Sequence, residues 1–146
     1  MAERLEDLLI WQRAVEFWEA VNPLLDRPGF SRNCDLQNQI RDAIDSVLSN
    51  ISEGFEQPTD RSFALYLYRS KASAAEVRSR LFIAWRREYI KESEHQRRAA
   101  IGNELARMLA GFIKYLYRCD RKRRGAGPDA PNDPPPDRPK WPRKKA

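Results

Sequence analysis

The stretch QIRDAIDSVLSNISEGF, from Gln39 to Phe55, decides the fold class. Ile40, Ile44, Val47 and Ile51 recur at intervals of three and four, so on a helix they fall within about 60° of one another. Polar and charged residues occupy the other positions of the stretch. This pattern predicts an amphipathic helix that buries one face, running from about Leu36 and ending at the glycine at position 54.

Three more helices are predicted around it, at about residues 8–22, 60–88 and 93–123. Pro23 and the turn at 27–29 break the first from the second. The expected N-cap residues are Asp7, Thr59 or Asp60, and Ser93 with Gln96 as its capping-box partner. No stretch alternates like a strand. Short connections favour antiparallel neighbours, so the sequence predicts an all-α, antiparallel up-down four-helix bundle.

The positive charge is concentrated at the C-terminus. The 146 residues carry a net charge of +6. Between Arg121 and Ala146, nine Lys and Arg face three Asp, which accounts for the whole surplus. Seven of the ten prolines lie between Pro128 and Pro142. We therefore expect a helical domain at residues 1–124 and a disordered basic, proline-rich tail at residues 125–146, with Gly125 as the stop signal.

Several classes of protein are not expected from this sequence. No apolar run reaches the length of a transmembrane helix, and acidic residues near the start do not fit a signal peptide, so a cytoplasmic location is predicted. Cys34 and Cys119 have no metal-binding spacing, and His95 has no partner arranged for catalysis. We predict no enzyme activity, no cofactor and no metal site.

Two segments resemble a known family, the four-helix bundle proteins encoded by intervening sequences within bacterial 23S ribosomal RNA genes. The first is LEDLLIWQRA, from Leu5 to Ala14, and the second is the stretch at 39–55. FALYLYRSKASAAE at 63–76 and REYI at 87–90 extend the match. Leu48 stands where the family usually has proline, and Ala72 replaces a usual glycine.

The resemblance implies a non-enzymatic homo-oligomer, a homopentamer with a barrel-like arrangement of bundles. A more distant relative is the accessory protein of diversity-generating retroelements, which binds nucleic acid and a reverse transcriptase. Nucleic acid and a reverse transcriptase are therefore the partners that the resemblance suggests for this chain.

A polar stripe on the 39–55 helix is a candidate oligomer interface. It lies about 120° from the apolar stripe and comprises Gln39, Ser46, Asn50 and Glu53. Short hydrogen-bonding side chains suit a contact with another subunit, because buried polar groups are costly unless they are paired. Simple exposure to solvent is the alternative interpretation of the same pattern.

Basic residues also line up along the last two predicted helices. One stripe comprises Arg69, Arg80 and Arg87, and the other comprises Arg107, Lys114, Arg118 and Arg121, followed by Lys122, Arg123 and Arg124. A solvated face is the ordinary meaning of such charges, but two stripes and a basic run favour phosphate binding. We predict binding to RNA or DNA with little sequence specificity. The alternative is a scaffold that recruits a protein such as a reverse transcriptase.

Overall fold

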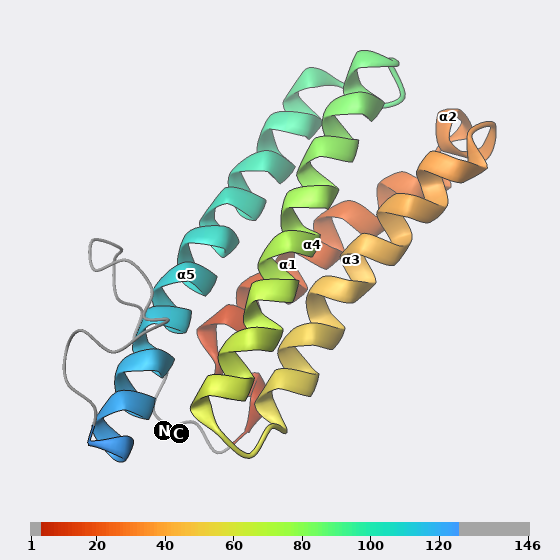
Figure 1. Cartoon of the computed structure of the whole chain (residues 1–146). Helices are drawn as coiled ribbons and strands as arrows, with labels where there is room; N and C mark the ends of the chain where they lie inside the picture. The colour runs from red at the N-terminus through yellow and green to blue at the C-terminus, as the bar shows by residue number, and fades with distance from the viewer. Residues whose placement is uncertain (1–3, 126–146) are drawn as a thin grey trace.

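Four long helices run alternately up and down in the computed structural model, which describes residues 4–125 (Figure 1). They are α1 (Leu9–Val21), α3 (Cys34–Phe55), α4 (Asp60–Arg86) and α5 (Glu92–Arg124). Three short elements accompany them: η1 (Leu5–Asp7), η2 (Asn22–Asp26) and α2 (Pro28–Ser31). The predicted all-α bundle is confirmed. The predicted tail lies outside the described residues from position 126 onward.

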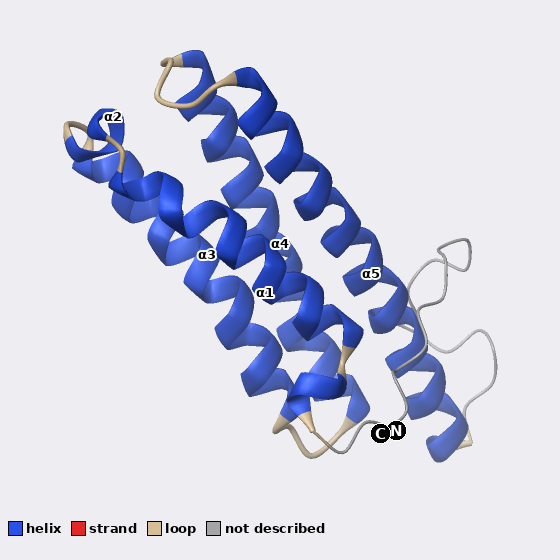
Figure 2. Cartoon of the chain, turned by 180° about the vertical axis from the view of Figure 1, so that it is seen from behind, coloured by secondary structure: helices blue, strands red, loops and turns tan. Residues whose placement is uncertain are grey.

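Each long helix packs against two others, and the four contacts close a ring. α3 packs on α4, α4 on α5, α5 on α1 and α1 on α3, an arrangement that the view from behind also shows (Figure 2). The apolar stripe of α3 faces the middle of this ring, where Ile40, Ile44, Val47 and Ile51 are fully buried. The predicted core stripe is therefore correct.

The helix ends differ from the prediction in two places. Thr59 caps α4 as expected, and its hydroxyl accepts the Ser62 N–H at 3.0 Å. Asp7, however, lies inside η1, so Leu8 precedes α1 without a side-chain cap. α5 begins at Glu92, and it is Glu94 that accepts the Lys91 N–H at 2.9 Å, in place of the predicted Ser93 and Gln96 pair. Gly125 ends α5 in the left-handed conformation, as its position suggested.

A Schellman turn ends α4 and directs the chain into α5. The Tyr89 N–H reaches the Ala84 carbonyl at 2.9 Å, and the Glu88 N–H reaches the Trp85 carbonyl at 2.8 Å. This geometry places Glu88 in the left-handed region, with φ of 64°. Glycine is the usual residue at this position, because a Cβ atom is strained there. Glu88 therefore destabilises the turn in which it lies.

Replacing Glu88 with glycine should stabilise the protein. Relief of the left-handed strain outweighs the larger chain entropy of glycine, for a gain of up to about 1 kcal/mol in the free energy of unfolding. Urea denaturation followed by helicity measures the gain. Glu88→Ala is the control, since it keeps the Cβ atom. Equal unfolding midpoints for the two variants would contradict the strain argument.

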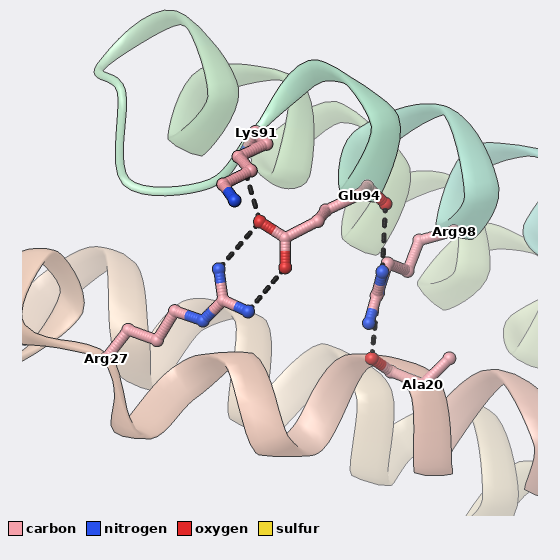
Figure 3. Close-up of polar contacts among 5 residues, drawn as sticks. All are labelled: Ala20, Arg27, Lys91, Glu94 and Arg98. Carbon is pink, nitrogen blue, oxygen red and sulfur yellow. Dashed lines mark hydrogen bonds and ion pairs between the residues drawn. The ribbon is translucent and has the colours of Figure 1, made fainter.

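Beside this turn, a polar network joins α5 to the end of α1 and to Arg27, which follows η2 (Figure 3). The carboxylate of Glu94 accepts two hydrogen bonds from the Arg27 guanidinium, one of them at 2.6 Å, as well as the Lys91 N–H. One turn further on, Arg98 Nε donates to the Ala20 carbonyl at 2.9 Å. The Arg27 guanidinium and the Lys91 N–H lower the pKa of Glu94 from its ordinary 4.5 to about 2.

The Arg27–Glu94 pair should give the protein a pH-dependent part of its stability. Since the pKa of Glu94 is lower in the folded state, this stability is complete above pH 4.5 and is lost as the pH falls toward 2. Glu94→Gln should cost roughly 1 kcal/mol at pH 7, because Arg27 is partly exposed to solvent. The cost should shrink as the pH falls from 4.5 to 2.

Unfolding in urea at pH 7 and at pH 3 measures this difference. Glu92→Gln is the control, since Glu92 is an exposed carboxylate on the same turn. A Glu94→Gln deficit that is the same at both pH values would show that the carboxylate charge contributes nothing.

Candidate nucleic-acid interface

The basic stripe predicted on α4 is partly occupied by contacts within the chain. Arg80 donates to Glu76 Oε1 at 3.1 Å and, across the α3–α4 contact, to Gln39 Oε1 at 2.8 Å. Arg69 is exposed and its guanidinium lies 4.9 Å from the centre of the Tyr66 ring. Arg87 is exposed at the C-cap of α4. Of the three residues, Arg69 and Arg87 present their charge to solvent most openly.

The stripe predicted on α5 is interrupted in its middle. Arg107 is exposed and pairs with Glu104 at 2.6 Å, and Arg118 and Arg121 are half-buried. Lys114 is only 4% exposed, which corrects the expectation that it lies on a solvated face. The helix is buried on nearly every side around this position, so the apolar spacing alone underestimated how much of it is covered.

In the described part of the chain, the C-terminal turns of α5 and the first turn of α4 hold a dense group of cations, named here the basic end: Arg61, Arg121, Lys122, Arg123 and Arg124. Three of them, Arg61, Arg123 and Arg124, pair with the carboxylates of Asp60 and Asp120. Both carboxylates are buried. Arg123 Nη2 lies 2.7 Å from Asp60 Oδ2, and Arg124 Nη1 lies 3.3 Å from Asp120 Oδ2.

The two carboxylates orient the arginines without cancelling the positive charge. The side chains of Arg123 and Arg124 stay about 60% exposed while their guanidiniums are paired. Arg61 is a third partner, 3.9 Å from Asp120 and stacked over the Tyr117 ring at 5.7 Å. With three more cations than anions, the basic end is chemically suited to anionic oxygens such as those of phosphate.

The four residues predicted as an oligomer interface lie along α3 in different environments. Gln39 and Glu53 are exposed, and Gln39 is bound by Arg80. Ser46 and Asn50 are half-buried, and Asn50 Nδ2 donates to the Ser46 carbonyl at 2.8 Å and to its hydroxyl at 3.0 Å. The amide of Asn50 is therefore satisfied within its own helix.

An exposed apolar surface on α4 is absent from the sequence-based expectations. Among residues 4–125, the exposed large apolar side chains all lie on this helix: Leu65, Tyr68, Phe82 and Ile83. The sequence spacing of these residues could have predicted the surface. Together with Ala72, Ala75 and Ser79 they recur at intervals of three and four residues, which places them on the side of the helix away from the core. Such a surface on an otherwise polar protein indicates contact with another molecule.

The large aromatic side chains differ in how deeply they are buried. Phe63 and Phe112 are buried in the core, whereas Trp11, Trp18 and Trp85 are half-buried at its edge. The indole of Trp18 explains its position, since its N–H donates to Asp45 Oδ1 at 2.8 Å.

The described residues offer no group of histidine, cysteine and carboxylate side chains that could hold a metal ion. Within the same part of the chain, no helix is both long and apolar enough to cross a bilayer. His95, the histidine noted in the sequence, stacks on Trp85.

Comparisons with known proteins agree with this fold. The family described as 23S rRNA-intervening sequence protein matches residues 6–111. A solved structure from Bacteroides thetaiotaomicron, described as a protein with unknown function from the S23 ribosomal protein family, has a TM-score of 0.65 and 22% identity. It covers 73% of this chain and 99% of its own, a likeness that shows the shared fold. No curated protein matches.

Proposed function

Because the chain belongs to the 23S rRNA-intervening sequence protein family, we propose that it is a non-enzymatic, oligomeric four-helix bundle that binds RNA or DNA. The observation that carries the proposal is the basic end, a group of five cations in which three arginines pair with two buried carboxylates and two of these arginines stay largely exposed. Arg69, Arg87, Arg107 and Arg118 extend the phosphate-binding surface along α4 and α5. Arg80 and Lys114, which have partners or are buried, contribute less to it.

Phosphate contact explains why little sequence specificity is expected. Arginine and lysine that bind the backbone set the position of the protein but carry no information on base sequence. Such binding weakens steeply with salt, because each neutralised phosphate releases counterions. In an oligomer the same basic surface is repeated, so that modest affinity per subunit adds up to firm binding.

Self-association is the second part of the proposal, with a homopentamer as the assembly that the family resemblance implies. Two features support it. The half-buried Ser46 and Asn50 form a nearly neutral strip on α3, and Leu65 and Tyr68 expose apolar surface at the N-terminal half of α4. Contact between subunits would remove this apolar surface from water, which is the main favourable term in association.

A protein-recruiting scaffold is the second candidate function. The exposed Leu65 and Tyr68 favour it, since apolar contacts serve a foreign partner, such as a reverse transcriptase, as well as another subunit. Salt separates the two functions. Nucleic-acid binding through phosphates should fall as salt rises, whereas an apolar protein contact should persist.

Removing positive charge from α5 should weaken nucleic-acid binding without unfolding the helix. Arg107, Arg118 and Lys122 lie within about 60° of one another on α5. Replacing all three with Gln should lower affinity for generic RNA at low salt. The slope of log affinity against log salt should fall by roughly 0.7–0.9 for each phosphate that the protein no longer neutralises. Filter binding across a salt series measures both quantities.

A matched control removes the same charge elsewhere. Arg13, Arg32 and Arg41 lie on α1, after α2 and on α3, outside the two helices that carry the basic end, and replacing them with Gln should leave affinity and slope close to those of the unchanged protein. Equal losses of affinity in the two triple variants would mean that only net charge matters. Unchanged binding in both would remove α5 from the proposed interface.

The chain should have a solution mass well above its own 17.1 kDa. Ser46→Arg, which places a long charged side chain in the proposed interface, should reduce that mass. Ser31→Arg, the same change at an exposed serine in α2, should not. Light scattering at micromolar concentration measures the mass. A value near 17.1 kDa for the unchanged protein would contradict self-association.

A further inference from the structure

Three aromatic rings meet at the turn between α4 and α5. The rings of Trp85 and His95 are stacked, with centroids 4.9 Å apart and an angle of 13° between their planes. The ring of Phe82 meets both edge-on, at 5.7 Å from Trp85 and 6.0 Å from His95. These three residues, named here the ring cluster, therefore join the last turns of α4 to the first turn of α5.

The ring cluster is held in place without being buried. Phe82 is 49% exposed, and Trp85 and His95 are half-buried. A phenylalanine that served only to fill the core would be hidden, as Phe63 and Phe112 are. Because its neighbours fix the Phe82 ring on one side, the surface that it shows to solvent is a rigid aromatic surface.

Cations border the ring cluster. The Arg86 guanidinium lies 5.2 Å from the centre of the Trp85 ring, on the same turn of α4. Arg86, Arg87, Lys91 and Arg97 are exposed around the turn, against the exposed Glu88 and Glu92. The charges of Glu94, Arg27 and Arg98 are already engaged in the polar network beside the turn (Figure 3). The charge that is left around the rings is therefore positive.

A pocket adjoins the ring cluster. It has a volume of about 380 Å³ and is lined by the aromatic Trp85 and Tyr89, by Ile90, and by two cations and two carboxylates: Arg27, Lys91, Glu88 and Glu92. Trp85 belongs both to the pocket and to the stacked pair. An aromatic surface, a recess and exposed cations thus occur together at one end of the bundle.

We propose that the ring cluster stacks an unpaired base of a single-stranded RNA or DNA, while Arg86 and Arg87 contact the neighbouring phosphates. This rests on the proposed nucleic-acid binding and names the strand type. A paired base in a duplex already stacks on both faces, so only a base outside a duplex can use the Phe82 ring. Stacking tolerates any base, because every base has a π-face, and it therefore agrees with low sequence specificity.

The position of the ring cluster separates it from the basic end. His95 and Lys122 lie on the same helix, 27 residues and roughly 40 Å apart at the rise of an α-helix. The ring cluster and the basic end therefore lie far apart on the bundle, although each has cations of its own. This separation allows each contribution to be measured alone.

Phe82→Leu tests the proposal, because leucine keeps an apolar side chain and removes the ring. Affinity for a single-stranded oligonucleotide should fall by roughly 5- to 150-fold, the range for loss of one base–ring stack. Affinity for a duplex of the same length should not change. The unchanged protein should bind an oligonucleotide with abasic positions more weakly than it binds the intact strand. Phe82→Leu should bind the abasic oligonucleotide no more weakly than it binds the intact strand.

Phe82→Tyr is the matched control. It keeps an aromatic ring at the same exposed position of α4. Its affinity for single strands should stay close to that of the unchanged protein. Equal reductions of affinity in the two variants would overturn the assignment, because the variant that keeps the ring would then lose as much as the variant that removes it.

Three further outcomes separate the two proposals. Binding of single strands and duplexes that is equal, salt-sensitive and unaffected by Phe82→Leu would overturn base stacking and leave phosphate binding standing. No binding of either nucleic acid by the unchanged protein at low salt would overturn the proposed function itself. A changed oligomer mass for Phe82→Leu alone, measured by light scattering, would assign Phe82 to a subunit interface and overturn the stacking site.

Discussion

The contact between α3 and α4 is the constraint on which the rest of the bundle depends. Ile40, Ile44, Val47 and Ile51 are fully buried in the middle of the ring of helices, and the Ser70 hydroxyl donates to the Val47 carbonyl at 2.8 Å inside the contact. The two helices meet closely at Gly54, where an added Cβ atom would lie 2.8 Å from the Phe63 ring and 2.9 Å from Tyr66 Cβ. The antiparallel pair of α3 and α4 thus requires glycine where α3 ends. The helices α1 and α5 complete the core by packing against this pair.

The sequence predicted what is periodic and local. The core stripe of α3, the Thr59 cap and the stop at Gly125 all depend on neighbours within a few residues, and all three are confirmed. The start of α5 was predicted one residue late and with the wrong capping pair, although Glu94 accepts the N–H of Lys91 only three residues away. The bond between Glu94 and Arg27, by contrast, joins residues 67 positions apart. The hydrophobic periodicity of a helix carries no information on a contact between residues so far apart in the sequence.

The same distinction applies to the candidate site. The basic run at positions 121–124 was evident in the sequence, but its pairing with Asp60 links residues 63 positions apart. The burial of Lys114 could not be predicted from the sequence either. Helical spacing shows on which side of a helix a residue lies, but not how much of that side other helices cover. The apolar residues of α4 were within reach, because Leu65, Tyr68, Phe82 and Ile83 keep helical spacing on a second face.

The two ends of the bundle use charge differently, and this follows from where carboxylates lie. At the α4–α5 turn, Glu94 binds Arg27 in the polar network, and the exposed Phe82 lies near the exposed Arg86 and Arg87. At the basic end, Asp60 and Asp120 are buried and hold arginines whose outer surfaces stay exposed. α5 joins the two ends as one continuous helix of 33 residues, which fixes their separation. If the chain assembles as proposed, each subunit presents rings and cations at a constant spacing. Binding would then depend on the number of subunits engaged more than on any single cation, because a rigid repeat lets successive contacts form at high effective concentration.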